Sequence, residues 1–125
     1  MDLEAFRQIC LEKAGTTEGL PFGEDVLVFK VLHKMFATLR LDSDEPAANL
    51  KCDPRRAEQL RESYADIQPG YHMNKKHWNT LYIAGALPYD LIIELIDHSY
   101  DLVVKGLTQK QKQALTEANH DNTQI

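Results

Sequence analysis

Apolar residues recur every three to four positions near the start of the chain, which is the spacing of a helix that buries one face. The residues that keep this spacing are Leu3, Phe6, Cys10 and Ala14. We expect an amphipathic helix here, with Asp2 as its N-cap and Gly15 as its stop. Segment 16–24 contains proline, glycine and two acidic residues. It is therefore expected to be a loop, with Phe22 tucked beneath it.

Two strand-like apolar runs follow this loop. They span residues 25–31 and 34–41, with only two residues between them, and this short connection predicts an antiparallel hairpin. Residues 42–46 are polar and mostly acidic, which predicts an exposed connection. Residues 48–52 then predict a third, shorter strand.

The dipeptide Asp53-Pro54 predicts the start of a second helix. An aspartate can cap the free backbone amides, and a proline at the first helical position sacrifices no hydrogen bond. Ala57, Leu60 and Tyr64 follow at helical spacing. They predict the face of this helix that packs against the rest of the domain.

The stretch Pro69–Thr80 concentrates unusual residues, since it contains the single Trp, two of the five His and an adjacent lysine pair. Pro69 followed by Gly70 predicts a type II turn. Polar and apolar residues then alternate along 77–82, which is the period of a strand with two different faces. We therefore expect the fourth and fifth strands here, as far as Ile83.

The longest helical stripe runs from Leu87 to Val104, opened by Pro88 and stopped by Gly106. This helix should be the main cover of the sheet. Segment 108–111 has the spacing of a capping box, so we expect one or two more helical turns after it. The polar end, Asn119 to Ile125, is expected to fray.

The predicted order is helix, three strands, helix, two strands and helix, which indicates a two-layer α+β domain with about five strands. At 125 residues, the chain is long enough for one hydrophobic core. We expect residues 1–107 to form a single domain and residues 108–125 a partly helical tail.

Charge is distributed unevenly, although the net charge of −5 argues against indiscriminate coating of nucleic acid. Residues 51–80 carry six basic and four acidic side chains, whereas the segments on either side are net acidic. No apolar run approaches the ~20 residues that cross a bilayer. The acidic N-terminus does not resemble a secretory signal. We expect a cytoplasmic, monomeric protein without a membrane partner.

Motifs for catalysis, metals and cofactors are weak. Cys10 and Cys52 lie far apart without zinc-type spacing and are expected to be buried free thiols. His72 and His77 are five residues apart, which places them on opposite faces of a strand rather than around one metal. The serines lie in no glycine-flanked elbow, and the glycines form no phosphate-binding pattern. We expect no catalytic residue, metal or cofactor and a non-enzymatic role, with an enzyme of an unrecognised type as the remaining alternative.

A basic and aromatic edge is the strongest candidate site, with DNA as its expected partner through weak, salt-sensitive binding. The side chains expected to meet phosphates are Lys34, Lys51, Arg55, Arg56, Lys75 and Lys76. Those expected to add hydrogen bonds or stacking are His72, Asn74, His77 and Trp78. The alternative is a small-ligand or protein-interaction module. In it the His, Asn and Trp side chains form a polar pocket, and the lysines hold an anionic group.

Four segments carry a resemblance to a known family: Lys34–Ala37, Leu50–Cys52, Pro69–Thr80 and Ser99–Val103. With them the chain resembles the MmcQ/YjbR family of small bacterial proteins. The resemblance implies a CyaY-like α+β fold and DNA binding by two hairpins that act as a pair of wings. CyaY itself is an iron-binding frataxin, but this chain lacks a dense acidic ridge on its first helix, so iron binding is not carried over. The stretch from Thr108 onward falls outside the resemblance.

Overall fold

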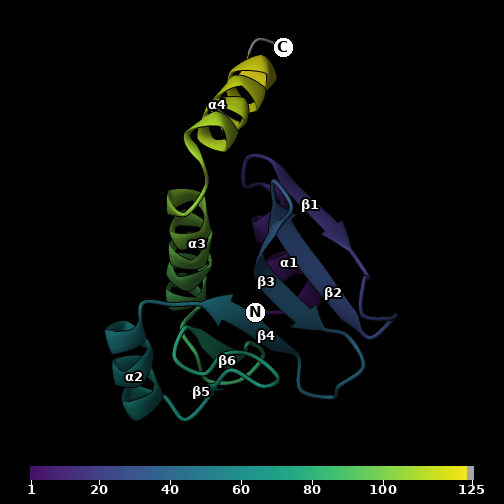
Figure 1. Ribbon diagram of the computed structural model, residues 1–125. Helices are drawn as coiled ribbons and strands as arrows, with labels where there is room; N and C mark the ends of the chain where they lie inside the picture. Colours follow the sequence, from purple (N-terminus) through teal and green to yellow (C-terminus); the bar gives the residue numbers. More distant parts are fainter. Residues whose placement is uncertain (124–125) are drawn as a thin grey trace.

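A six-stranded antiparallel sheet forms one layer of the protein (Figure 1). The computed structural model describes residues 1–123. The strands are β1 (Thr16–Gly19), β2 (Val26–Val31), β3 (Lys34–Arg40), β4 (Ala47–Lys51), β5 (Ile67–Pro69) and β6 (Trp78–Tyr82). Their order in the sheet is β1-β2-β3-β4-β6-β5. The predicted α+β class is confirmed, with six strands instead of about five.

Helices α1 (Leu3–Leu11), α2 (Pro54–Ser63) and α3 (Tyr89–Lys105) cover one face of this sheet. Helix α4 (Gln109–Thr123) follows α3 and extends beyond it (Figure 1). Helix α1 packs against β1 and β3, α3 packs against β2, β3 and β4, and α2 lies beside β5 and β6 (Figure 1). Leu39, Leu50 and Leu81 are buried in the core. Because strand residues alternate between faces, their neighbours Thr38 and Thr80 lie on the opposite side, called the open face below.

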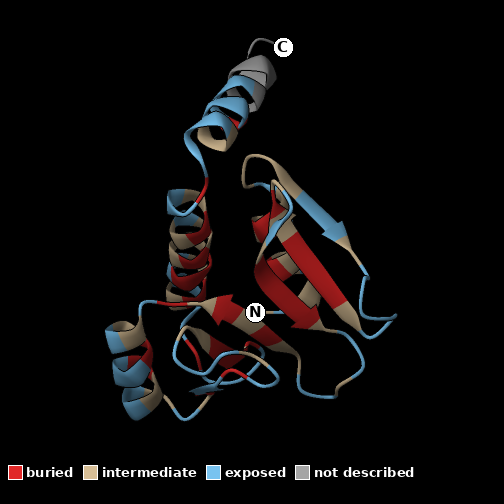
Figure 2. Ribbon diagram, in the orientation of Figure 1, coloured by how far each residue is buried: buried red, intermediate tan, exposed pale blue. Residues whose placement is uncertain are grey.

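Aromatic rings connect α1, the sheet and α3. Phe6 lies 6.3 Å from Phe29, and Phe29 lies 6.5 Å from Phe36, between ring centroids. Phe36 in turn meets the ring of Tyr100 edge-on at 5.3 Å. All three phenylalanines have no exposed surface. Figure 2 shows the buried residues concentrated on β2, β3 and the side of α3 that faces the sheet.

Capping signals predicted three helix starts correctly. The carboxylate of Asp2 accepts a first-turn backbone N–H of α1 at 2.8 Å, and that of Asp53 accepts one of α2 at 3.2 Å. At the start of α4, Thr108 and Gln111 exchange two hydrogen bonds of 2.9 and 3.1 Å. The two-residue β2–β3 hairpin and the extent of α3 from Pro88 to Gly106 are also confirmed.

Segment 16–24 is not a loop throughout, so the sequence prediction was wrong there. Strand β1 pairs with β2 in antiparallel register from Thr16 to Gly19. The edge of β2 offers unpaired backbone groups, and this long-range pairing outweighs a weak local signal. Phe22 is 72% exposed instead of tucked beneath the loop.

The turn after Pro69 also differs from the predicted type II geometry. His72, with a φ of 58°, adopts the left-handed conformation, and Gly70 does not. Gly70 is required for space instead. A Cβ atom there would lie 2.9 Å from both the Cβ and the carbonyl oxygen of Trp78.

Helix α4 is longer than the one or two predicted turns. It continues to Thr123, so the predicted frayed end is helical up to that residue, and residues 124–125 lie outside the described residues. Leu115 is buried and lies close enough to Gly15 that a Cβ atom there would approach its Cδ1 atom to 2.5 Å. This contact with the start of β1 gives α4 tertiary support that its local sequence does not reveal.

Both cysteines are buried free thiols, as predicted. Burial raises the pKa of Cys10 to about 12 and that of Cys52 to about 11. Since the thiolate is the reactive form, we expect neither to react with iodoacetamide at neutral pH in the folded protein and both to react in denaturant. Mass spectrometry counts the adducts. Native modification as fast as that of the denatured chain would contradict this expectation.

Two neighbouring residues of α3 connect that helix to the sheet and to α2. The Ser99 hydroxyl donates to the carbonyl of Phe36 at 2.5 Å and accepts the N–H of Lys51 at 2.8 Å. The Nε2 atom of His98 accepts the N–H of Asp53 at 3.1 Å. His98 must therefore keep this nitrogen unprotonated.

Acidification is expected to weaken the contact of His98. Burial and the positive charge of Arg56 lower its pKa, against the opposing charges of Asp53, Asp101 and Glu94. The unfolded chain then binds the proton more readily than the folded one. This contribution to stability is therefore complete above the unfolded pKa of ~6.5 and is lost as the pH falls through the lowered folded value. We expect the urea midpoint of His98→Gln to change less between about pH 7.5 and about pH 5 than that of the parent.

The exposed histidine His33 provides the control for this measurement. His33→Gln should keep the pH dependence of the parent chain. An equal pH dependence in His98→Gln and the parent would show that His98 does not carry the effect.

Candidate functional site

Three polar side chains form a row across the centre of the open face. Thr38 of β3 is the register partner of Asn49 of β4, which is in turn the partner of Thr80 of β6. Thr38 and Thr80 are almost fully buried, at 5% and 4% exposure, although they lie on the face away from the helices. Something other than a helix therefore covers this row.

The cover is the segment 70–77, called the latch loop below. The Thr80 hydroxyl accepts the N–H of Tyr71 at 2.9 Å and donates to the Asn49 side-chain oxygen at 2.5 Å. The Asn49 amide reaches back to the Tyr71 carbonyl at 3.4 Å. At the base of the loop, the ammonium group of Lys75 donates to the carbonyl of Gly70 at 3.0 Å. The loop is thus held over the sheet by side chains of two strands.

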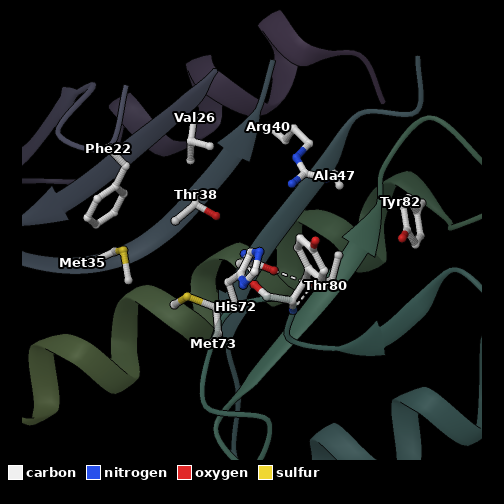
Figure 3. Close-up of a pocket in the computed structure, with 12 residues that line it drawn as sticks. Phe22, Val26, Met35, Thr38, Arg40, Ala47, His72, Met73, Thr80 and Tyr82 are labelled. Atoms are coloured by element: carbon white, nitrogen blue, oxygen red, sulfur yellow. Dashed lines mark hydrogen bonds between the residues drawn. The ribbon is translucent and has the colours of Figure 1, made fainter. Parts of the chain in front are cut away.

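A cavity of about 430 Å³ lies between the latch loop and the sheet. Its walls come from the open face, from Tyr71, His72 and Met73 of the latch loop, and from Phe22 of the β1–β2 connection. Figure 3 shows Phe22 and Met35 on one side of it and Arg40 on another. The cavity is therefore apolar at one end and carries a cation at the other.

Two contacts with the Tyr71 ring lie at the charged end. The guanidinium carbon of Arg40 lies 5.1 Å from the ring centroid of Tyr71, within the range of a cation–π contact. The ring of His72, the next residue in the sequence, lies 4.0 Å from the same tyrosine ring. The left-handed backbone of His72 accompanies this placement. Among the described residues that line the cavity, none is an aspartate or a glutamate.

Two of the cations predicted to meet phosphates bind other groups of the protein instead. Arg56 pairs with Glu94 of α3 at 2.6 Å, and Lys75 donates to a backbone carbonyl in the latch loop. Four others make no salt bridge or side-chain hydrogen bond with a described residue: Lys34, Lys51, Arg55 and Lys76. The predicted basic edge is therefore partly committed to internal contacts.

The four remaining predicted site residues, two of them histidines, lie in different surroundings. Trp78 is the register partner of Lys51 on the open face and is half-buried. Asn74 accepts the N–H of Lys76 at 2.9 Å within the latch loop, and the carbonyl of His77 accepts the N–H of Cys52 at 2.8 Å. His72 is the one member of the predicted set that lines the cavity.

Sequence reasoning missed most of the cavity. Four of its lining residues on β3 and β4 were predicted only as parts of strands and not as site residues: Met35, Thr38, Arg40 and Asn49. Thr38 and Arg40 occupy alternate positions of β3 and Asn49 is the register partner of Thr38, whereas Met35 lies beyond the register shift between β2 and β3. This arrangement becomes readable only once the register of the strands is known.

Within residues 1–117, whose side chains the structure describes, no cluster of three or more His, Cys, Asp or Glu side chains is suited to hold a metal ion. No helix within residues 1–123 combines the length and apolar character that crossing a membrane requires.

Helices on one face of an antiparallel sheet and a loop-lined cavity on the other define a small two-layer α+β domain with a candidate site on its open face. The family model described as YjbR matches residues 11–102. The chain belongs to the YjbR family, as its sequence motifs indicated.

Relatives and solved structures agree with this assignment. The chain is 32% identical over 117 residues to YjbR of Escherichia coli K12, covering 94% of this chain and 99% of that protein. It is 36% identical over 109 residues to YbdF of Escherichia coli O157:H7, covering 87% and 89%. The names of these relatives state no activity.

Two crystal structures are similar in fold. Deinococcus radiodurans protein DR2400, with its DUF419 domain, superposes with a TM-score of 0.85 at 40% identity, over 91% of this chain and 87% of that one. A Pseudomonas syringae protein gives a TM-score of 0.72 at 29% identity, over 82% and 98%. The layer arrangement described above is therefore shared with solved structures.

Proposed function

We propose that the chain is a non-enzymatic binding protein that takes a small, flat, largely apolar molecule into the open-face cavity. The observation that carries this proposal is the cavity itself, about 430 Å³ in volume with apolar walls and a few polar groups. Small-molecule sites typically have volumes of about 300–1,000 Å³ and this mixture of walls. The proposal keeps the cytoplasmic location and monomeric state expected from the sequence.

Preorganisation of the latch loop supports the proposal. Thr80 and Asn49 hold the backbone of Tyr71 over the sheet before any ligand arrives. A binding surface that is already ordered loses less conformational entropy on association. Two thioethers, Met35 and Met73, line the walls and can adapt to a flat ligand.

The test is a titration with the neutral aromatic probe 2-naphthalenemethanol, followed by amide chemical shifts in NMR spectra. Perturbations should gather on the latch loop and on the strand positions around Thr38 and Asn49. Shifts gathered on α1, α3 or α4 instead would contradict the proposal, and so would the absence of any shift at millimolar probe.

A second candidate function is DNA binding of the double-wing type that the family resemblance implies. The observation that favours it is the register pair of Lys51 and Trp78 on the open face, beside the exposed Lys76 of the latch loop. The β2–β3 hairpin and the β5–β6 hairpin would be the two wings. If four cations neutralised phosphates, the logarithm of the binding constant would fall with that of salt at a slope of about −3.6.

Fluorescence anisotropy with a labelled duplex at low and moderate salt tests this candidate. The double variant Lys51→Gln/Lys76→Gln should lower the salt slope to about −1.8, since each phosphate contact contributes about 0.9. Lys110→Gln, an exposed cation on α4, is the matched control and should not change the slope. Affinity that is unchanged in the double variant would remove DNA from consideration.

A further inference from the structure

We propose that the ligand of the open-face cavity carries an anionic oxygen group, a carboxylate or a phosphate, which the guanidinium of Arg40 binds. This inference rests on the proposed function, because it assigns a chemical class to the ligand of the same cavity. It is independent of the lysines that the sequence predicted for an anionic group.

The charge of the cavity lining is the first argument. Arg40 is the single Lys or Arg among the described residues that line the cavity, and no acidic side chain accompanies it in that lining. Its side chain is 42% exposed, so the guanidinium is neither buried nor fully solvated. Its ion pair with Asp42 is solvent-exposed on both sides and therefore weak, so the cation still favours a negative partner over a neutral one.

The geometry of the guanidinium is the second argument. Its Nε atom lies 3.6 Å from a carboxylate oxygen of Asp42, longer than a hydrogen bond. Its central carbon lies 5.1 Å from the centroid of the Tyr71 ring. Among the described residues, none accepts a hydrogen bond from its Nη atoms. Asp42 and Tyr71 therefore orient the group while leaving its outer N–H donors for a ligand, and such a fork matches a carboxylate or phosphate.

Space beside the guanidinium is the third argument. Arg40 is the register partner of Ala47, which is the partner of Tyr82 across β4 and β6. The small alanine leaves room on the sheet between two larger side chains (Figure 3). The apolar end of the cavity, with Phe22 and Met35, lies on a different side of the cavity from Arg40. A ligand that fits both ends is amphiphilic, with a flat apolar body and one acidic group.

Matched probes test the inference. 2-Naphthoate, 2-naphthyl phosphate and neutral 2-naphthalenemethanol share one ring system and differ in charge. Isothermal titration calorimetry should show that at least one anion binds more tightly than the alcohol. Arg40→Gln should lower the affinity for that anion by about 10–100-fold, because hydrogen bonds to charged groups are lost, and should leave the alcohol unaffected. The ratio of the two anions shows which acidic group the site prefers.

Two further variants keep the result interpretable. Arg40→Lys retains the charge without the planar fork and should fall between the parent and Arg40→Gln. Lys110→Gln removes a distant exposed cation and should bind every probe as the parent does. Circular dichroism verifies that each variant is folded.

The anionic inference and the proposed function are contradicted by different results. Equal affinity for the alcohol and both anions, unchanged by Arg40→Gln, overturns the anionic inference and leaves the cavity as a binding site. Failure of all three probes to bind overturns both the anionic inference and the proposed function.

Discussion

Phe36→Ala is expected to lower the free energy of unfolding by about 3–5 kcal/mol, the range measured for buried aromatic truncations. Phe36 has no exposed surface and contacts both Phe29 and Tyr100. It lies opposite a register shift between β2 and β3. Urea denaturation followed by circular dichroism measures the change.

Tyr89→Ala is the control for this truncation, because Tyr89 is 51% exposed at the start of α3. Its removal should alter the free energy of unfolding by no more than about 0.5 kcal/mol. A loss of less than about 1 kcal/mol in Phe36→Ala would show that the aromatic contacts between the sheet and α3 are not central to the core.

Thr80→Val is expected to have the largest effect on the candidate site. The substitution keeps the shape of the side chain but leaves the N–H of Tyr71 and the side-chain oxygen of Asn49 without their shared partner. An unsatisfied buried polar group costs about 1–3 kcal/mol, so the free energy of unfolding should fall by that amount. The latch loop should also loosen, with faster amide hydrogen exchange at Tyr71 and weaker binding of 2-naphthalenemethanol.

Thr80→Ser retains the hydroxyl and is the matched control. It should keep slow exchange at Tyr71 and most of the probe affinity. If Thr80→Val binds the probe as the parent does, the latch loop does not determine the shape of the cavity.

Elements whose signals are local could be predicted from the sequence. Three helix starts are marked by side chains that accept a hydrogen bond from the first turn of the helix, namely those of Asp2, Asp53 and Thr108. Pro88 and Gly106 mark the ends of α3 through their backbone properties, without a side-chain hydrogen bond. The two-residue β2–β3 connection fixes its own hairpin. Each of these depends on residues that are close in the chain.

Features that depend on distant partners could not be predicted in this way. Strand β1 exists because β2 offers an edge, and the extra turns of α4 accompany the contact of Leu115 with Gly15. The cavity depends on the register of β3, β4 and β6, which brings Thr38, Asn49 and Thr80 into one row. No periodicity within a single strand contains that information.

Charge clustering along the sequence was a poor guide for the same reason. Arg56 is close in sequence to Lys51 and Arg55, yet its partner is Glu94, 38 residues away on α3. No binding role was predicted for Arg40 from the sequence, because its neighbours in sequence are apolar and acidic. The fold places it beside Tyr71, and this pairing gives the cavity its cation.

The most direct test of the open-face cavity is a crystal structure of the protein in complex with 2-naphthoate. The naphthalene ring is expected between the latch loop and the sheet, near Phe22 and Met35. The carboxylate is expected within hydrogen-bond distance of the Arg40 guanidinium. A probe bound against the helices, or an empty cavity in crystals grown with millimolar probe, would contradict the account.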